Sequence, residues 1–160
     1  MNFFKKFFNI PVKEDADIQK QEVNLSLDDL FVHNFVEKGG KFLYCVNKHE
    51  VISNFKKVIT ENNWKDIFLL EDRLSLFFNK KDINSVSNFN ENTPIFTTCE
   101  HLIADKGDVL FSSNQLGSNK LKEFPDDFIV FATTSQLVKD TGQGLTGIKT
   151  NSKDILPTNI

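Results

Sequence analysis

Short apolar runs of strand length alternate with amphipathic stretches of helix length in this chain, and this alternation constrains its fold more than any other feature. The apolar runs are residues 41–46, 66–70, 94–98, 103–111 and 127–132. Near-continuous apolar strands are typical of a parallel sheet that is covered on both faces. The pattern predicts an α/β fold in which an open, mostly parallel sheet is flanked by helices.

Capping residues place the helices between these runs. Ser26 is suited to cap a helix over 27–38, which Gly39 and Gly40 would end. Asn47 and Glu50 resemble a capping pair for a second helix over 48–62. With strands at 41–46 and 66–70 on either side, the second helix predicts a right-handed parallel crossover.

The second half of the chain is predicted to be rich in strands. Turn residues at 105–107 divide the run 103–111 and predict a hairpin or a tight bend. The polar stretch 83–93 is predicted to be a loop, and a short helix is expected around 73–78. Ser135 would cap a last helix over 136–141.

The sequence predicts one domain over 25–160, preceded by an N-terminal amphipathic segment and flexible linker over 1–24. Four phenylalanines at 3, 4, 7 and 8 would share one face of a helix. Packing on the chain's own domain is the favoured interpretation of that face, and weak contact with a membrane surface is the alternative. Residues 11–24 are polar and aperiodic, which predicts a mobile linker.

Composition argues against several classes of protein. A net charge of −3 and a pI of about 5.6 predict that nucleic acid is not a partner. Two cysteines, Cys45 and Cys99, are too few to hold an iron–sulfur cluster, and they indicate buried thiols in a reducing compartment. The sequence shows no apolar run of about 20 residues and no signal peptide, so we expect a cytoplasmic protein without a transmembrane segment.

The segment IADKGDVLFSS at 103–113, followed by Pro125 and the run at 128–131, resembles the LUD domain of lactate-utilisation protein C relatives. In that family the typical order is I-A-E-T-G-T, a strand, L-P and then H-I-V-V. Asp105 takes the acidic position of the motif, Gly107 the glycine and Pro125 the proline. Lys106 and Asp108 stand in place of two threonines, and Phe128 stands in place of the histidine.

The resemblance implies a fold like that of the NagB/RpiA/CoA-transferase group. It also implies an accessory role in lactate utilisation or oxidation, beside iron–sulfur partner proteins. The departures from the motif favour an alternative, a non-catalytic small-anion-binding or scaffolding module of the same fold with a degenerate site. Neither hypothesis comes with an identified set of catalytic residues. We therefore expect no independent catalytic activity, no cofactor and no metal.

Polar residues left over from the predicted core define the candidate ligand site. Its members are Asp105, Lys106, Asp108, Ser112, Ser113, Asn114, Gly142 and Gly144. The last two belong to a Gly-x-Gly-x-x-Gly stretch at 142–147, predicted to be a flexible loop because no strand precedes it. If the segments 105–108, 112–114 and 142–147 converge in the fold, their backbone N–H groups and Lys106 would hold a small anion.

The stretch Cys99-Glu100-His101 is the densest set of reactive side chains. A thiol needs a cationic neighbour to become a nucleophile, and His101 could supply one. Packing in the core is the favoured role of Cys99, because free cysteines are among the most buried residues. A CoA-transferase-like enzyme would need a carboxylate nucleophile, for which Glu100 and Asp105 are the candidates.

Overall fold

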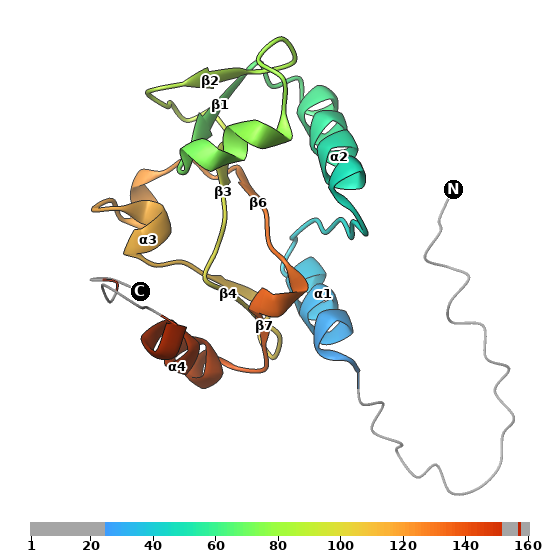
Figure 1. Cartoon of the computed structure of the whole chain (residues 1–160), viewed down its shortest axis with the longest axis vertical. Helices are drawn as coiled ribbons and strands as arrows, with labels where there is room; N and C mark the ends of the chain where they lie inside the picture. Colours follow the sequence, from blue (N-terminus) through green and yellow to red (C-terminus); the bar gives the residue numbers. More distant parts are fainter. Residues whose placement is uncertain (1–24, 152–156, 158–160) are drawn as a thin grey trace, which may run out of the picture.

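The computed structural model describes residues 25–151 and Pro157 (Figure 1). Four strands form a parallel sheet, sheet A, in the spatial order β2-β1-β3-β6. Their bounds are β1 Asp66–Leu69, β2 Asn84–Val86, β3 Ile95–Thr97 and β6 Phe128–Val130. The predicted α/β class, with a mostly parallel sheet flanked by helices, is confirmed.

Three further strands form a smaller sheet, sheet B, in the order β5-β4-β7. They are β4 (His101–Ile103), β5 (Asp108–Leu110) and β7 (Leu137–Val138). β4 and β5 form the predicted hairpin, with antiparallel pairing, whereas β4 and β7 are parallel.

Two stretches of chain, 95–103 and 128–138, run side by side through both sheets. β3 leads into β4 after three residues, and β6 leads into β7 through the 3₁₀ helix η4 (Thr134–Gln136). β3 pairs with β6 in sheet A, and β4 pairs with β7 in sheet B. Sheet B therefore lies beyond the carboxyl ends of the sheet A strands (Figure 1).

The first two helices form where their caps predict. In α1 (Leu27–Glu37), the Ser26 side chain accepts a hydrogen bond from the backbone N–H of Asp29. In α2 (Lys48–Glu61), the Asn47 side chain accepts one from the N–H of Glu50. The remaining helices are η2 (Asp72–Phe77), α3 (Ser113–Leu116), η3 (Leu121–Glu123) and α4 (Thr141–Asn151).

Two hydrophobic clusters divide the core along the same line as the sheets. One joins α2 and η2 to sheet A, with Phe55, Ile67 and Phe96 at its centre, and Trp64 packs against it. The other joins α1 to sheet B around Phe31 and Leu102. A chain of phenylalanine rings also runs from β1 to the end of β5, each within 6.1 Å of the next: Phe68, Phe89, Phe124, Phe128 and Phe111.

The strand predicted over 41–46 is wrong. The structure describes this segment fully, and it runs unpaired between α1 and α2 (Figure 1). The right-handed crossover that depended on this strand is therefore also wrong. A strand needs a neighbour to bond with, and an apolar run does not show whether one is present.

The end of the chain also differs from the prediction. Instead of a helix over 136–141 capped by Ser135, the chain forms η4, then β7, and then α4. The Gly-x-Gly-x-x-Gly stretch at 142–147 lies inside α4, so the predicted flexible loop is wrong. The predicted loop at 83–93 contains β2, the edge strand of sheet A.

No helix in the described part of the chain is long and apolar enough to cross a membrane. The predicted phenylalanine face and linker of residues 1–24 lie outside the described residues.

Candidate functional site

The predicted site residues Asp105 and Lys106 lie in the turn between β4 and β5, and both are exposed. The side-chain amide of Asn34 in α1 donates hydrogen bonds to the backbone oxygens of Ala104 at 2.8 Å and of Asp105 at 3.2 Å. The backbone N–H of Asp105 donates to the carbonyl of Lys139 at 3.0 Å. The backbone of this turn is thus used to join α1 and the segment before α4 to the hairpin.

Gly107 and Asp108 complete that junction. Gly107 is buried with a φ of +63°, and a Cβ atom there would lie 2.3 Å from the backbone nitrogen of Phe35. Only glycine fits such a position. The Asp108 carboxylate forms an ion pair with Lys38, at the end of α1. The backbone of Asp105 and the small size of Gly107, at the acidic and glycine positions of the motif, therefore allow α1 to pack on this turn.

Ser112, Ser113 and Asn114 form the start of α3, and Ser112 and Asn114 bind Glu100. The Glu100 Oε1 atom accepts hydrogen bonds from Ser112 Oγ at 2.5 Å, Asn114 Nδ2 at 2.7 Å and Gln115 Nε2 at 3.2 Å. Ser112 is buried and also caps α3. These polar groups were predicted to hold a ligand, and those of Ser112 and Asn114 hold a carboxylate of the protein itself.

The two groups of predicted residues lie at opposite ends of β5. Asp108 begins this strand and Ser112 follows it, and four extended residues span about 13 Å. The hairpin therefore keeps Asp105 and Lys106 apart from Ser112 and Asn114. The structure does not bring these two groups together at one point, and their binding of a ligand stays a prediction.

The predicted anion loop is the capped start of α4. The Asp140 carboxylate accepts a hydrogen bond from the N–H of Gln143 at 2.9 Å, and Gln143 Oε1 accepts one from the N–H of Lys139 at 2.9 Å. Gly142 is exposed in the first turn. A carboxylate already occupies this helix end, which disfavours a second anion there.

Gly144 has a packing role. It is buried, and an added Cβ would lie 3.1 Å from Ile103 Cδ1 and 3.3 Å from Leu110 Cδ2. The small residue allows α4 to pack closely on the β4–β5 hairpin. Gly142 and Gly144 thus belong to one helix, and of these two glycines Gly144 is the one that faces the sheet.

The packing role of Cys99 is confirmed. The residue is buried in the cluster around Phe31, and burial, with smaller contributions from Glu100 and Glu71, raises the pKa of its thiol to about 12. The backbone carbonyl of Cys99 accepts a hydrogen bond from Gln136 Nε2 at 2.5 Å. Such a thiol is protonated at neutral pH and is a poor nucleophile.

A polar cluster that the sequence did not predict lies where β1 and β3 end. These strands are adjacent in sheet A, although β2 comes between them along the chain. Glu71 follows β1 and Thr98 follows β3. In parallel α/β sheets, ligands bind beyond the carboxyl ends of the strands at a switch point of this kind. This edge is therefore the candidate functional site on topological grounds.

Glu71 is the centre of that cluster. Its Oε1 accepts hydrogen bonds from the Thr98 backbone N–H at 2.9 Å and from Thr98 Oγ1 at 2.6 Å. Its Oε2 accepts from Arg73 Nε at 2.8 Å and from Arg73 Nη2. Partial burial alone would raise the pKa of Glu71, but these hydrogen bonds and the Arg73 charge outweigh it and lower the pKa below its ordinary value.

The chemistry of this cluster is that of a structural tie. A carboxylate with four donors is held ionised, so it is a poor proton donor, and its bonds join the end of β1 to the end of β3. The sequence carries a partial signal for it, since Glu71 and Arg73 directly follow a buried strand. Thr98, 27 residues away, could not be linked to them without the strand order.

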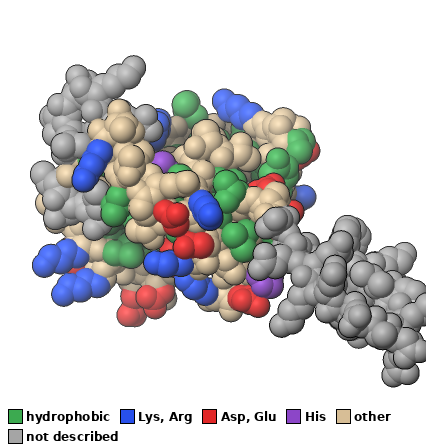
Figure 2. Space-filling model, turned by 90° about the horizontal axis from the view of Figure 1, so that it is seen from below, with side chains coloured by type: hydrophobic (Ala, Val, Ile, Leu, Met, Phe, Trp, Pro, Cys, Tyr) green, Lys and Arg blue, Asp and Glu red, His purple; other side chains and the backbone are tan. Residues whose placement is uncertain are grey.

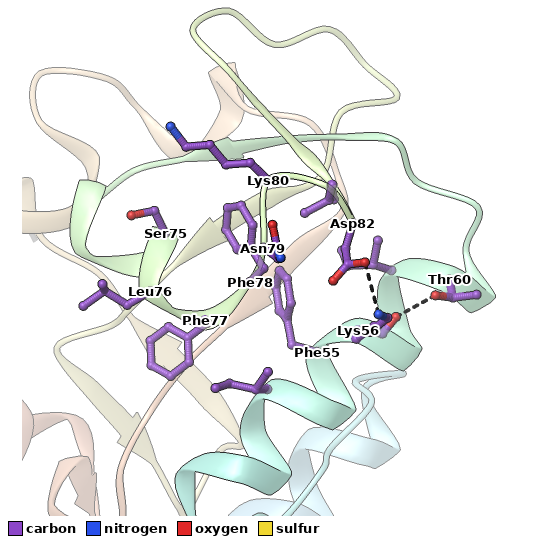
Figure 3. A pocket seen from close by; sticks show the side chains of 13 residues that line it. Phe55, Lys56, Thr60, Ser75, Leu76, Phe77, Phe78, Asn79, Lys80 and Asp82 are labelled. Carbon is purple, nitrogen blue, oxygen red and sulfur yellow. Dashed lines mark hydrogen bonds and ion pairs between the residues drawn. The ribbon is translucent and has the colours of Figure 1, made fainter.

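A groove of about 580 Å³ lies between α2 and η2 (Figure 3), and Glu71, Arg73 and Thr98 are not among the residues that line it. Phe55, Phe77 and Phe78 give it an apolar lining, and at its rim Lys56 Nζ and the Asp82 carboxylate form an ion pair at 3.1 Å. It contains no cluster of acid, base or nucleophile. On the face seen from the α1 and α4 end, charges of both signs are mixed (Figure 2). Over residues 25–151 and Pro157, no three His, Cys, Asp or Glu side chains are grouped as metal ligands.

The chain was compared with models of protein families, with curated proteins and with solved structures, and it matches none of them.

Proposed function

We propose that this chain is an LUD-type accessory protein of lactate utilisation, which acts in the cytoplasm through contacts with iron–sulfur proteins and without catalysis of its own. Sheet A would then be the parallel sheet of a NagB/RpiA/CoA-transferase-like fold. The proposal rests on the motif at 103–131, and it is supported by the position of Gly107, which requires a glycine.

The observation that most supports the proposal is the fit between the motif and the junction it forms. Gly107 has the positive φ and the close approach to α1 that only glycine allows. The backbone of Asp105 bonds to α1 and to the segment before α4. Residues that are shared with a family because they hold its fold together are expected at such a junction.

The absence of a catalytic role is supported by the groups that would carry one. Phe128, in place of the motif's histidine, packs between Phe111 and Phe124. Glu71 and Glu100 are each held by several hydrogen bonds within the protein. A small-anion site at the turn has less support, because Lys38 already pairs with Asp108 and a carboxylate caps α4.

A growth experiment tests the proposal. Deletion of the gene should slow growth on lactate but not on a fermentable sugar, and the full chain should restore it. Asp105→Asn should restore growth equally, because the exposed side chain has no chemical role in the proposal. Normal growth of the deletion strain on lactate would overturn the accessory role. Failure of a stable Asp105→Asn protein to restore growth would overturn its non-catalytic character.

A further inference from the structure

The groove between α2 and η2 has a largely apolar lining that is open to solvent (Figure 3). Its volume of about 580 Å³ lies within the range of natural binding clefts. Leu76 lines the groove and is 70% exposed, although the next two residues, Phe77 and Phe78, pack against the core. An exposed leucine beside other apolar residues is typical of a surface that a further apolar element covers.

The aromatic walls of this groove are held in place by the core. The Phe55 and Phe78 rings stack with centroids 5.6 Å apart, and the Phe77 ring lies edge-on to Phe96 at 6.0 Å. Phe55 and Phe96 are buried in the sheet A cluster. Figure 3 shows Phe55, Phe77 and Phe78 around one space. A surface that is fixed in this way loses little entropy when it is covered, and its rings pack favourably against further rings.

The charges of the groove do not select an ionic ligand. At the rim, Lys56 and Asp82 neutralise each other in an ion pair. Among the described residues that line the groove, the other charged side chain is Lys80. The apolar side chains therefore decide what the groove binds, and an occupant with an apolar face fits it best.

The chain itself carries a face of this kind in residues 3–8, which lie outside the described part. The four phenylalanines of this segment form two pairs, each one helical turn apart, so on a helix they share one side. The two lysines between them would project from the opposite side, away from Lys80. Apolar side chains one turn apart are the usual anchors of a short helix that binds in an apolar groove.

The length of the chain before Leu25 allows this segment to reach the groove. Residues 9–24, sixteen in all, span up to about 53 Å when extended, whereas a domain of this size has a radius of gyration of about 14 Å. A flexible tether gives an effective concentration on the order of millimolar. A free protein at micromolar concentration would have to bind roughly a thousandfold more tightly to compete. The tether therefore favours the chain's own segment over a second copy or another protein.

We propose that residues 3–8 bind in the groove between α2 and η2 of the same chain, with their phenylalanine face against Leu76, Phe77 and Phe78. The contact covers the exposed leucine and joins the N-terminal segment to the sheet A half of the molecule. It needs no partner protein, and it stands or falls independently of the role in lactate utilisation.

Amide hydrogen exchange of the full chain tests this contact. Exchange over residues 3–8 should be at least about threefold slower than in an unstructured chain, because docking shields these amides. Leu76→Ser should weaken docking roughly tenfold and remove most of this protection, because less apolar surface is buried. Leu121→Ser, in η3, is the matched control: Leu121 is 49% exposed but does not line the groove, so protection should equal that of the wild type. Equal exchange in β3 shows that all three proteins are folded.

A substitution in the segment itself gives the reciprocal test. Phe4→Ser combined with Phe8→Ser should speed exchange over 76–80 in the full chain, because the groove is then uncovered. Unprotected amides over 3–8 in the wild type would overturn the contact, and so would protection that Leu76→Ser leaves unchanged. Protection that rises with protein concentration would place the segment on a second copy. Protection that appears only with phospholipid vesicles would assign the phenylalanine face to a membrane surface. Either of these two results overturns the inference.

Discussion

Single residues decide how the parts of this protein are joined. Gly107 lets α1 approach the β4–β5 turn, and Glu71 joins the ends of two strands through Thr98 and Arg73. Gly107 could be predicted from sequence as a turn residue, because glycine in a turn has a local cause. The hydrogen bonds between Glu71 and Thr98 could not be predicted, because only the order of the strands brings these two residues together.

Gly107→Ala should destabilise the protein by at least ~2 kcal/mol, because it combines a positive φ with a close contact to the backbone of α1. Urea unfolding followed by circular dichroism measures the change. Gly39→Ala is the matched control: its φ is +90°, but no atom lies within 4 Å of the added Cβ. It should cost only about 1 kcal/mol. Equal losses in the two variants would show that the contact with α1 is unimportant.

Thr98→Val should reduce the free energy of unfolding at pH 7 by about 1–3 kcal/mol, because Glu71 loses a donor in a half-buried site. The folded-state pKa of Glu71 lies below its ordinary value of 4.5, so its contribution is present above that pH. The contribution is lost as the pH falls through the lowered pKa.

Urea unfolding across the acid range checks this prediction. The stabilities of the wild type and Thr98→Val should approach each other as Glu71 becomes protonated. A carbon NMR titration should place the Glu71 pKa higher in the variant. A constant stability difference down to the most acid pH would mean that the hydroxyl acts independently of the carboxylate charge.

The first two helices, which have local capping signals, formed as predicted, whereas the strand at 41–46, which depends on a distant neighbour, did not. α1 and α2 follow from Ser26 and Asn47, whose capping hydrogen bonds involve residues only three positions away. The run at 41–46 has the composition of a buried strand, but no neighbouring strand pairs with it in the described part of the chain. The start of α4 was missed because its glycines suggested a loop, whereas the cap at Asp140 and the packing of Gly144 give a helix.

Asp140→Ala should destabilise α4 by about 1 kcal/mol, because it removes the cap of that helix. Amide hydrogen exchange over 144–150 should become faster, while exchange in β1 should not change. Asp126→Ala, at an exposed position outside any helix, is the matched control and should leave both regions unchanged. Unaltered exchange over 144–150 in Asp140→Ala would show that the cap does not hold this helix.

As a whole, the protein consists of two packed halves. The stretches 95–103 and 128–138 each contribute one strand to either half. Sheet A with α2 has one hydrophobic cluster, and sheet B with α1 has another. The α/β class and the parallel sheet could be predicted from the apolar runs alone. The division into two sheets could not, because residues 98–100, which join β3 to β4, include no glycine or proline to mark the end of one strand and the start of another.

This division predicts that each half opens partly on its own. Phe31→Leu, in the sheet B cluster, should cost ~1–2 kcal/mol and should speed hydrogen exchange mainly in β4, β5 and β7. Phe55→Leu is the matched change in the other cluster and should act mainly on β1 and β3. If either variant speeds exchange equally in both sheets, the molecule opens as one cooperative unit.

The placement of Trp64 has a practical consequence for spectroscopy. The chain has one tryptophan and one tyrosine, and its other aromatic side chains are phenylalanines. Trp64 packs against the sheet A cluster, whereas Tyr44 lies at the exposed surface between α1 and α2. Tryptophan emission therefore follows the environment of the sheet A half, and a change in Tyr44 absorbance follows the surface segment between α1 and α2. The two signals can be recorded in the same cuvette without any added dye.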